Sequence, residues 1–193
     1  MDFMYTRNTV IDNSNVLELV GAASMLQIED LRKRCSRFLA RQIDASNVIN
    51  IRDFAQQLFL EDLKVTATNF LTDNFEKVME HEEFMEMSHE KLVEILQFDF
   101  LRVRSEYVPL FGVLRWLQHD LVTRAEQAFQ VLQHIRLLHF TNLAYVQRIV
   151  EKLPHNLESA EECEKFLENI RRSKRRLVGS SHEDTLSYPR FEW

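Results

Sequence analysis

Apolar residues of this 193-residue chain recur three and four positions apart from about residue 16 onward. This spacing places them on one face of an α-helix. Asn15 followed by Glu18 predicts a capping box at the start of the first helix, with Asn15 as the N-cap. We expect the first two helices to form a tight pair. Their apolar positions are Val16, Leu17, Val20 and Ala23, and then Leu31, Cys35, Phe38 and Leu39.

The same periodicity predicts further antiparallel helix pairs. A third helix follows residues 45–47, which form a natural cap, and a shorter helix begins at about Ser88. Were Ser105 the N-cap of the next helix, Pro109 would remove its first regular hydrogen bond, so this helix is predicted to begin one residue later, near Glu106. The third and fourth helices carry Val48, Ile51, Ala55 and Leu58, and then Leu63, Ala67, Phe70, Leu71 and Phe75.

Beyond these, the pattern predicts helices over 125–135 and 141–152 and a last helix capped by Ser159. Residues 178–193 lose the periodicity and gain serine and charge, which is typical of a mobile tail. The whole pattern predicts an all-α fold built from antiparallel helix pairs.

Composition supports this fold class. Three glycines and three prolines are too few for the turns of an all-β protein or for a phosphate-binding loop. The two cysteines, Cys35 and Cys163, lack a partner at metal-ligand or redox-motif spacing, which indicates a reducing, intracellular setting. Neither a membrane span nor a secretory leader is evident, so we expect a cytoplasmic protein without a membrane partner.

Charge is distributed unevenly over a net charge of −6, which argues against nucleic acid as the main partner. Solvated helix faces explain most charge runs of this kind. The run from Arg171 to Arg176 has the composition of a nuclear import signal, but a basic helix end that complements the helix dipole explains it equally well. A second basic face contains Arg32, Lys33, Arg34, Arg37 and Arg41, and an acidic stretch contains Glu76, Glu80, Glu82, Glu83, Glu86, Glu90 and Glu94.

Candidates for chemistry are few. The seven histidines form no HExxH motif, and no serine or cysteine has a base at a motif-like offset. His119 with Asp120 could form an acid–base pair, but a histidine at a helix C-terminus that interacts with the dipole is favoured. Trp116 could anchor a partner, although its helical spacing favours the core. We therefore predict no catalytic residue, no cofactor and no metal.

An ordered series of short motifs runs through the first 155 residues. It consists of DFMYT at 2–6, NVLELVGAASMLQIEDLRKRCSRFL at 15–39, SNVINIRDFAQQLFLEDLKVTATNFLTDNFEKV at 46–78, EEF at 82–84, Asp99, Ser105-Glu106, LRW at 114–116, HD at 119–120 and IRL at 135–137. This series resembles the BTB-BACK proteins, and among them the Kelch-like branch. The resemblance implies the C-terminal part of a BTB domain over 1–44, a BACK domain over 45–155, a last helix over 156–177 and the tail.

Such proteins resemble substrate adaptors of cullin-RING ubiquitin ligases. The resemblance implies that a cullin of the cullin-3 type is the partner, that dimerisation of the BTB type requires a complete BTB front, and that a Kelch propeller holds the protein substrate. The front of the BTB domain and the propeller are expected to be missing from this chain, as in a truncated form. The alternative is a non-ligase BTB-BACK interaction module in nuclear or cytoskeletal assemblies, with actin as one candidate partner.

In the family, an apolar groove near residues 46–60 receives the extended N-terminal segment of the cullin. The resemblance therefore favours Ile51, Phe54, Leu58 and Phe59 as its lining, although core packing accounts for them equally well. We expect apolar clefts between helices, without converging polar groups.

Overall fold

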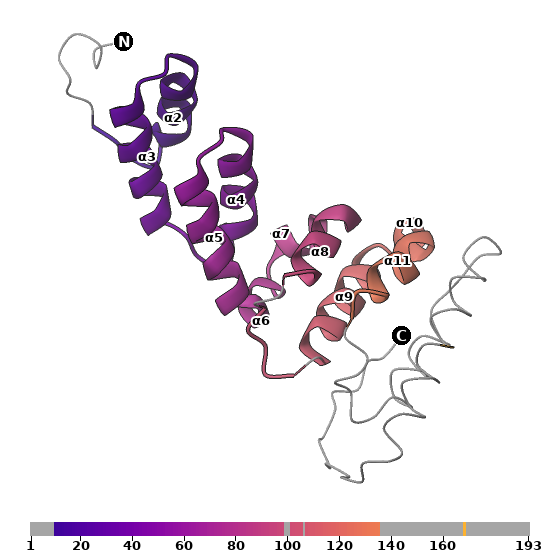
Figure 1. Ribbon diagram of the computed structural model, residues 1–193. Coiled ribbons are helices and arrows are strands. Elements are labelled where there is room, and N and C mark those ends of the chain that lie inside the picture. The colour runs from indigo at the N-terminus through magenta and orange to yellow at the C-terminus, as the bar shows by residue number, and fades with distance from the viewer. Residues whose placement is uncertain (1–9, 99–100, 106, 136–167, 169–193) are drawn as a thin grey trace. The chain divides into compact units, whose positions relative to one another are not determined.

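The computed structural model describes residues 10–98, 101–105, 107–135 and 168, and these residues form two compact units (Figure 1). The first unit comprises residues 10–86 together with 101–102, and the second comprises 87–98 and the described residues from 103 onward. The described residues contain helices and turns but no strand, which confirms the predicted all-α fold. Within them, no helix is long and apolar enough to cross a membrane.

Two helical hairpins build most of the first unit (Figure 1). Their apolar faces share one core. The buried positions of the first helix are Val16, Val20 and Ala23, as predicted, whereas Leu17 is half exposed. Leu17 lies one position beyond the face that contacts the second helix, so its prediction as a core residue was wrong. The four helices are α2 (Val16–Met25), α3 (Glu29–Arg41), α4 (Val48–Gln57) and α5 (Glu61–Asp73).

The two hairpins are copies of one sequence unit. Residues 12–41 and 44–73 align at an offset of 32, with DNSNV matching DASNV and LQIEDL matching LFLEDL. Both copies begin with the same hydrogen bonds: the carboxylate of Asp12 accepts from the Ser14 N–H at 2.9 Å, and that of Asp44 accepts from the Ser46 N–H at 2.8 Å. The repeat therefore sets the local structure of α2 to α5.

These bonds correct the capping predictions. The side chain of Asn15 makes no bond to the helix that it precedes. Its amide oxygen instead accepts from the Asp12 N–H at 3.1 Å, and its amide nitrogen donates to the Val10 carbonyl at 2.9 Å. Asn47 bonds backward in the same way, to Asp44. The aspartate three residues before each asparagine closes a turn by accepting from the backbone N–H groups that follow it. This turn competes with the capping box for those N–H groups.

Each hairpin turns through a Schellman motif, in which the residue after the helix end takes a left-handed conformation. That residue is Gln27, with φ of 56°, in the first hairpin and Phe59, with φ of 54°, in the second. The closing bonds match: the Ile28 N–H donates to the Ala23 carbonyl at 2.8 Å, and Leu60 N–H donates to the Ala55 carbonyl at 2.8 Å. Neither turn uses the glycine that normally occupies this position.

Two short helices complete the first unit, α6 (Phe75–Val78) and α7 (Glu82–Glu86). Phe75 was predicted in the fourth helix, but α5 ends at Asp73 because the Asn74 side chain bonds back to the Phe70 carbonyl at 3.0 Å and Asn74 begins a new helix. The Phe75 and Phe84 rings pack edge to face, with their ring centres 5.7 Å apart. The carboxylate of Glu83 accepts from the backbone and side-chain N–H groups of Asn50, which ties α7 to the start of α4.

The second unit contains the helices α8 (His89–Leu96), α9 (Tyr107–His119), α10 (Leu121–Arg124) and α11 (Ala128–Leu132), with a 3₁₀ turn, η1, over Ala125–Gln127. The predicted start of α8 is confirmed. In α9, Pro109 is the third helical residue. Backbone N–H groups in this first turn have no carbonyl partner within the helix, so the proline removes no hydrogen bond. The predicted late start is therefore also confirmed.

Trp116 lies in the core of the second unit with 1% of its surface exposed. Its ring N–H donates to the Met87 carbonyl at 2.8 Å, and the Arg124 guanidinium lies 4.2 Å from the ring centre. These contacts confirm the core interpretation of Trp116.

The helix predicted over 125–135 is found only in part, because residues 125–127 form η1 and α11 covers only Ala128–Leu132. The chain instead enters α10 at Leu121, because the Asp120 carboxylate accepts from the Thr123 N–H at 3.2 Å and caps that helix, and it then passes through η1 into α11. The helix predicted over 141–152, the basic run 171–176, the tail and, apart from the helical and exposed Glu168, the last helix after Ser159 lie outside the described residues.

Candidate partner-binding groove

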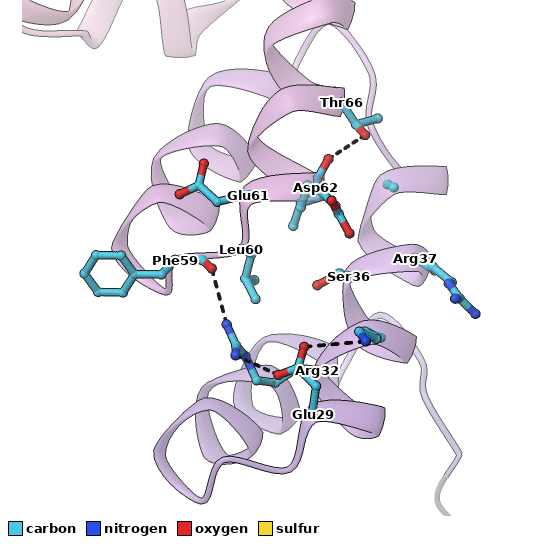
Figure 2. A pocket seen from close by; sticks show the side chains of 12 residues that line it. Glu29, Arg32, Ser36, Arg37, Phe59, Leu60, Glu61, Asp62 and Thr66 are labelled. Atoms are coloured by element: carbon cyan, nitrogen blue, oxygen red, sulfur yellow. Dashed lines mark hydrogen bonds and ion pairs between the residues drawn. The ribbon is translucent and has the colours of Figure 1, made fainter.

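A cavity of about 470 Å³ lies between α3 and the start of α5 in the first unit (Figure 2). One wall comes from α3 and the other from the turn between α4 and α5 together with the first turns of α5. Helical spacing explains the first wall, because successive turns of α3 present their side chains in one direction. The lining residues are Glu29, Arg32, Lys33, Ser36, Arg37 and Ala40 from α3, and Phe59, Leu60, Glu61, Asp62, Leu63 and Thr66 from the second wall.

The two walls carry charges of opposite sign. Cationic side chains predominate on α3, where Glu29 pairs with Arg32 at 2.9 Å and lies 4.0 Å from the Lys33 ammonium. Glu61 and Asp62 follow on the first turn of α5. Within the described part of the chain, the carboxylates of Glu61 and Asp62 make no ion pair. A ligand in this cavity would therefore meet free acidic groups on one side and cations on the other.

The turn at Phe59 forms one end of the cavity, and Arg32 fixes its position. The Nη2 atom of Arg32 donates to the Leu58 carbonyl at 3.2 Å and to the Phe59 carbonyl at 3.3 Å. Its Nη1 atom donates to the Glu29 carboxylate at 2.9 Å. Phe59 is 79% exposed, and its ring points away from Ser36 and Arg37 (Figure 2). An arginine of the first hairpin thus holds the turn of the second.

Only one of the four predicted lining residues borders this cavity, namely Phe59. Ile51, Phe54 and Leu58 are half-buried, and they pack against the shared core of the two hairpins. A role in binding stays a prediction for all four. Arg32, Lys33 and Arg37 were identified from the sequence only as a charged helix face, because nothing local shows that α5 begins opposite them.

The groove contains no reactive centre. Its one hydroxyl on α3, Ser36, has no histidine or thiol among its cavity neighbours. Cys35 lies on the buried side of the same helix, where burial raises the pKa of its thiol and so disfavours the nucleophilic thiolate. In the described ranges, no three histidine, cysteine, aspartate or glutamate side chains gather as metal ligands. His119 and Asp120 lie in the second unit, where Asp120 caps α10.

The fold and the groove define a class of protein: an all-helical protein with a cleft between two neighbouring helical hairpins. Comparison with family models gives the family. Residues 48–151 match the model described as BACK, "BTB And C-terminal Kelch", and residues 1–43 match the BTB/POZ domain. The chain therefore belongs to the BACK family and carries BTB sequence ahead of its BACK domain. Because α3 lies in the BTB match and α5 in the BACK match, the groove spans the junction between the two domains.

Proposed function

We propose that this protein is a substrate-adaptor scaffold of a cullin-RING ubiquitin ligase, and that the groove between α3 and α5 receives the cullin. The observation that carries the proposal is the position of the groove, because one wall belongs to the BTB match and the other to the BACK match. A chain with only one of these domains would have half of the site. BTB-BACK domains are typical of cullin-3 adaptors, which makes cullin-3 the partner to test.

The chemistry of the groove suits a polypeptide segment. Its volume of about 470 Å³ lies in the range of ordinary ligand pockets, so it holds a few side chains and not a whole helix. Lys33 and Arg37 on α3 and the free carboxylates of Glu61 and Asp62 complement a segment that carries charges of both signs. Leu60 and Ala40 supply an apolar floor between them. The function proposed is thus recognition, without a chemical step.

Filling the groove tests the proposal. Ala40 is half-buried on the lining wall, and Ala22 is exposed on α2 away from the groove, so Ala40→Trp and Ala22→Trp place the same bulk inside and outside the site. Affinity for the N-terminal region of cullin-3 would be measured by biolayer interferometry, with circular dichroism to confirm that both variants are folded. We expect Ala40→Trp to abolish binding and Ala22→Trp to bind like the wild type.

Two results would contradict the proposal. The first is a folded Ala40→Trp variant that binds cullin-3 as tightly as the wild type, which would exclude the groove. The second is a wild-type chain that does not bind cullin-3 at all, which would exclude the ligase role.

A further inference from the structure

Phe59 occupies a position where its side chain destabilises the turn. A left-handed conformation is unfavourable for every residue with a Cβ atom, and for a bulky aromatic residue it is a genuine outlier. Packing of the side chain recovers little of this, because Phe59 is 79% exposed. The repeat shows that the turn itself does not require an aromatic residue, because the equivalent turn is closed equally well by Gln27. An outlier of this kind directs attention to function.

The Phe59 turn also has an external support that the Gln27 turn lacks. Arg32 donates to two successive carbonyls, those of Leu58 and Phe59, and is itself held by Glu29. No side chain of the described residues donates to the carbonyls of Leu26 and Gln27. The side chain of Arg32 is only 22% exposed, so its guanidinium lies within the wall of the groove while it donates to the carbonyls of the turn. The aromatic ring is therefore presented from a fixed backbone.

We propose that Phe59 is the aromatic anchor of the partner bound in the groove, and that Arg32 is the positioning residue that holds it. This inference rests on the proposed function and names how the same site gains its affinity. The cullin segment lies between α3 and α5 and covers the exposed Phe59 ring at the end of the groove. Aromatic residues on rigid supports bind at a small entropic cost, which is why they dominate interface energetics.

A double-mutant cycle tests the inference. Phe59→Gly removes the ring and gives the turn its preferred residue, so the variant keeps its fold. Arg32→Met removes the clamp at nearly constant side-chain length. Gln27→Gly is the matched control, since it makes the same backbone change in the equivalent turn without removing an aromatic ring. Affinity for the N-terminal region of cullin-3 is measured for the wild type, each single variant and the Phe59→Gly/Arg32→Met pair, with thermal unfolding recorded for all.

We expect Phe59→Gly to weaken binding by about 30-fold, the loss typical of an interface hot spot, while Gln27→Gly binds like the wild type. Arg32→Met should weaken binding by about tenfold in the parent and leave it unchanged in the Phe59→Gly background, because it acts through the ring. An equal loss in both backgrounds would show that Arg32 contacts the cullin directly and would overturn its positioning role.

Wild-type affinity in the Phe59→Gly variant would overturn the anchor while the proposed function stands. Absence of binding by the wild-type chain would overturn both. The two failures are therefore distinguishable in one set of measurements.

Discussion

The backbone at residue 59 should reverse the ordinary preference for alanine over glycine. In a helix interior glycine is the less stable of the two, because it loses more conformational freedom on folding. Phe59 has φ of 54°, where a Cβ atom is strained and glycine is not. We therefore expect Phe59→Gly to be more stable than Phe59→Ala. Both variants lack the ring, so their difference reports on the backbone alone.

The magnitude follows from two opposing effects. Relief of left-handed strain contributes about 1–2 kcal/mol in favour of glycine. The greater freedom of glycine in the unfolded chain opposes it by roughly 0.5–1 kcal/mol. The net expectation is that Phe59→Gly exceeds Phe59→Ala by up to about 1.5 kcal/mol in free energy of unfolding, with a central value of about 0.75 kcal/mol. The same sign is expected for glycine against alanine at residue 27, which has φ of 56°.

Gly21 supplies the control of opposite sign. It lies inside α2, in the same unit as Phe59, and a Cβ atom added there would meet no atom within 4 Å. Gly21→Ala should therefore stabilise the protein by roughly 0.5–1 kcal/mol. Urea unfolding followed by far-ultraviolet circular dichroism measures all of these variants. Equal stability of alanine and glycine at residue 59, or a higher stability of alanine, would refute the assignment of strain to this turn.

Three further predictions concern the fold. Trp116→Ala should lower the free energy of unfolding by about 3–5 kcal/mol, because the residue is buried in the core. Trp116→Phe should lower it by about 1–3 kcal/mol, because the Met87 carbonyl loses its buried donor. Thermal unfolding measures both variants, and a loss below about 1 kcal/mol for Trp116→Ala would contradict the core assignment. Burial raises the pKa of Glu83 above its ordinary value of 4.5, against the opposing N–H groups of Asn50. As pH falls, the folded state binds a proton on Glu83 before the unfolded chain does, so the free energy of unfolding should rise as pH falls from above the folded pKa toward 4.5. Glu83→Gln should remove this rise. Stability profiles against pH that run parallel for the wild type and Glu83→Gln would refute this prediction. Asp44→Ala should cost about 1 kcal/mol in urea unfolding by opening the turn before α4, whereas an unchanged midpoint would show that this turn is dispensable.

Helix faces were predictable from the sequence because burial follows spacing directly. Val16, Val20 and Ala23 are buried as their spacing requires, and the late start forced by Pro109 is also found. Helix ends were less predictable, because several side chains compete for the same few backbone groups. Asn15 with Glu18 fits the capping-box pattern, but the Asp12 carboxylate accepts from the Ser14 N–H and from the Asn15 N–H, the group that the Glu18 carboxylate would otherwise take.

The groove could not be predicted from local sequence patterns, for a different reason. Its defining contact joins the Arg32 side chain to carbonyls at residues 58 and 59, and carbonyls have no residue-type signature. The basic face of α3 was identified from the sequence. That face lines a groove only because α5 lies opposite it, and no local pattern in the sequence indicates this neighbour.

One signal in the sequence does point to the groove, namely the repeat at an offset of 32 residues. Aligning its two copies equates Phe59 with Gln27 and assigns both to the turn, LQI in one copy and LFL in the other, that precedes the shared EDL. A repeat that tolerates glutamine in one copy shows that the aromatic residue of the other is not needed for the turn. Because internal copies share their fold, a difference between them at an exposed, strained position separates what folding requires from what binding requires. The comparison of the two copies, together with the exposure and φ of Phe59, therefore supports Phe59 as the proposed anchor over Ile51, Phe54 and Leu58, whose half-buried side chains pack against the core.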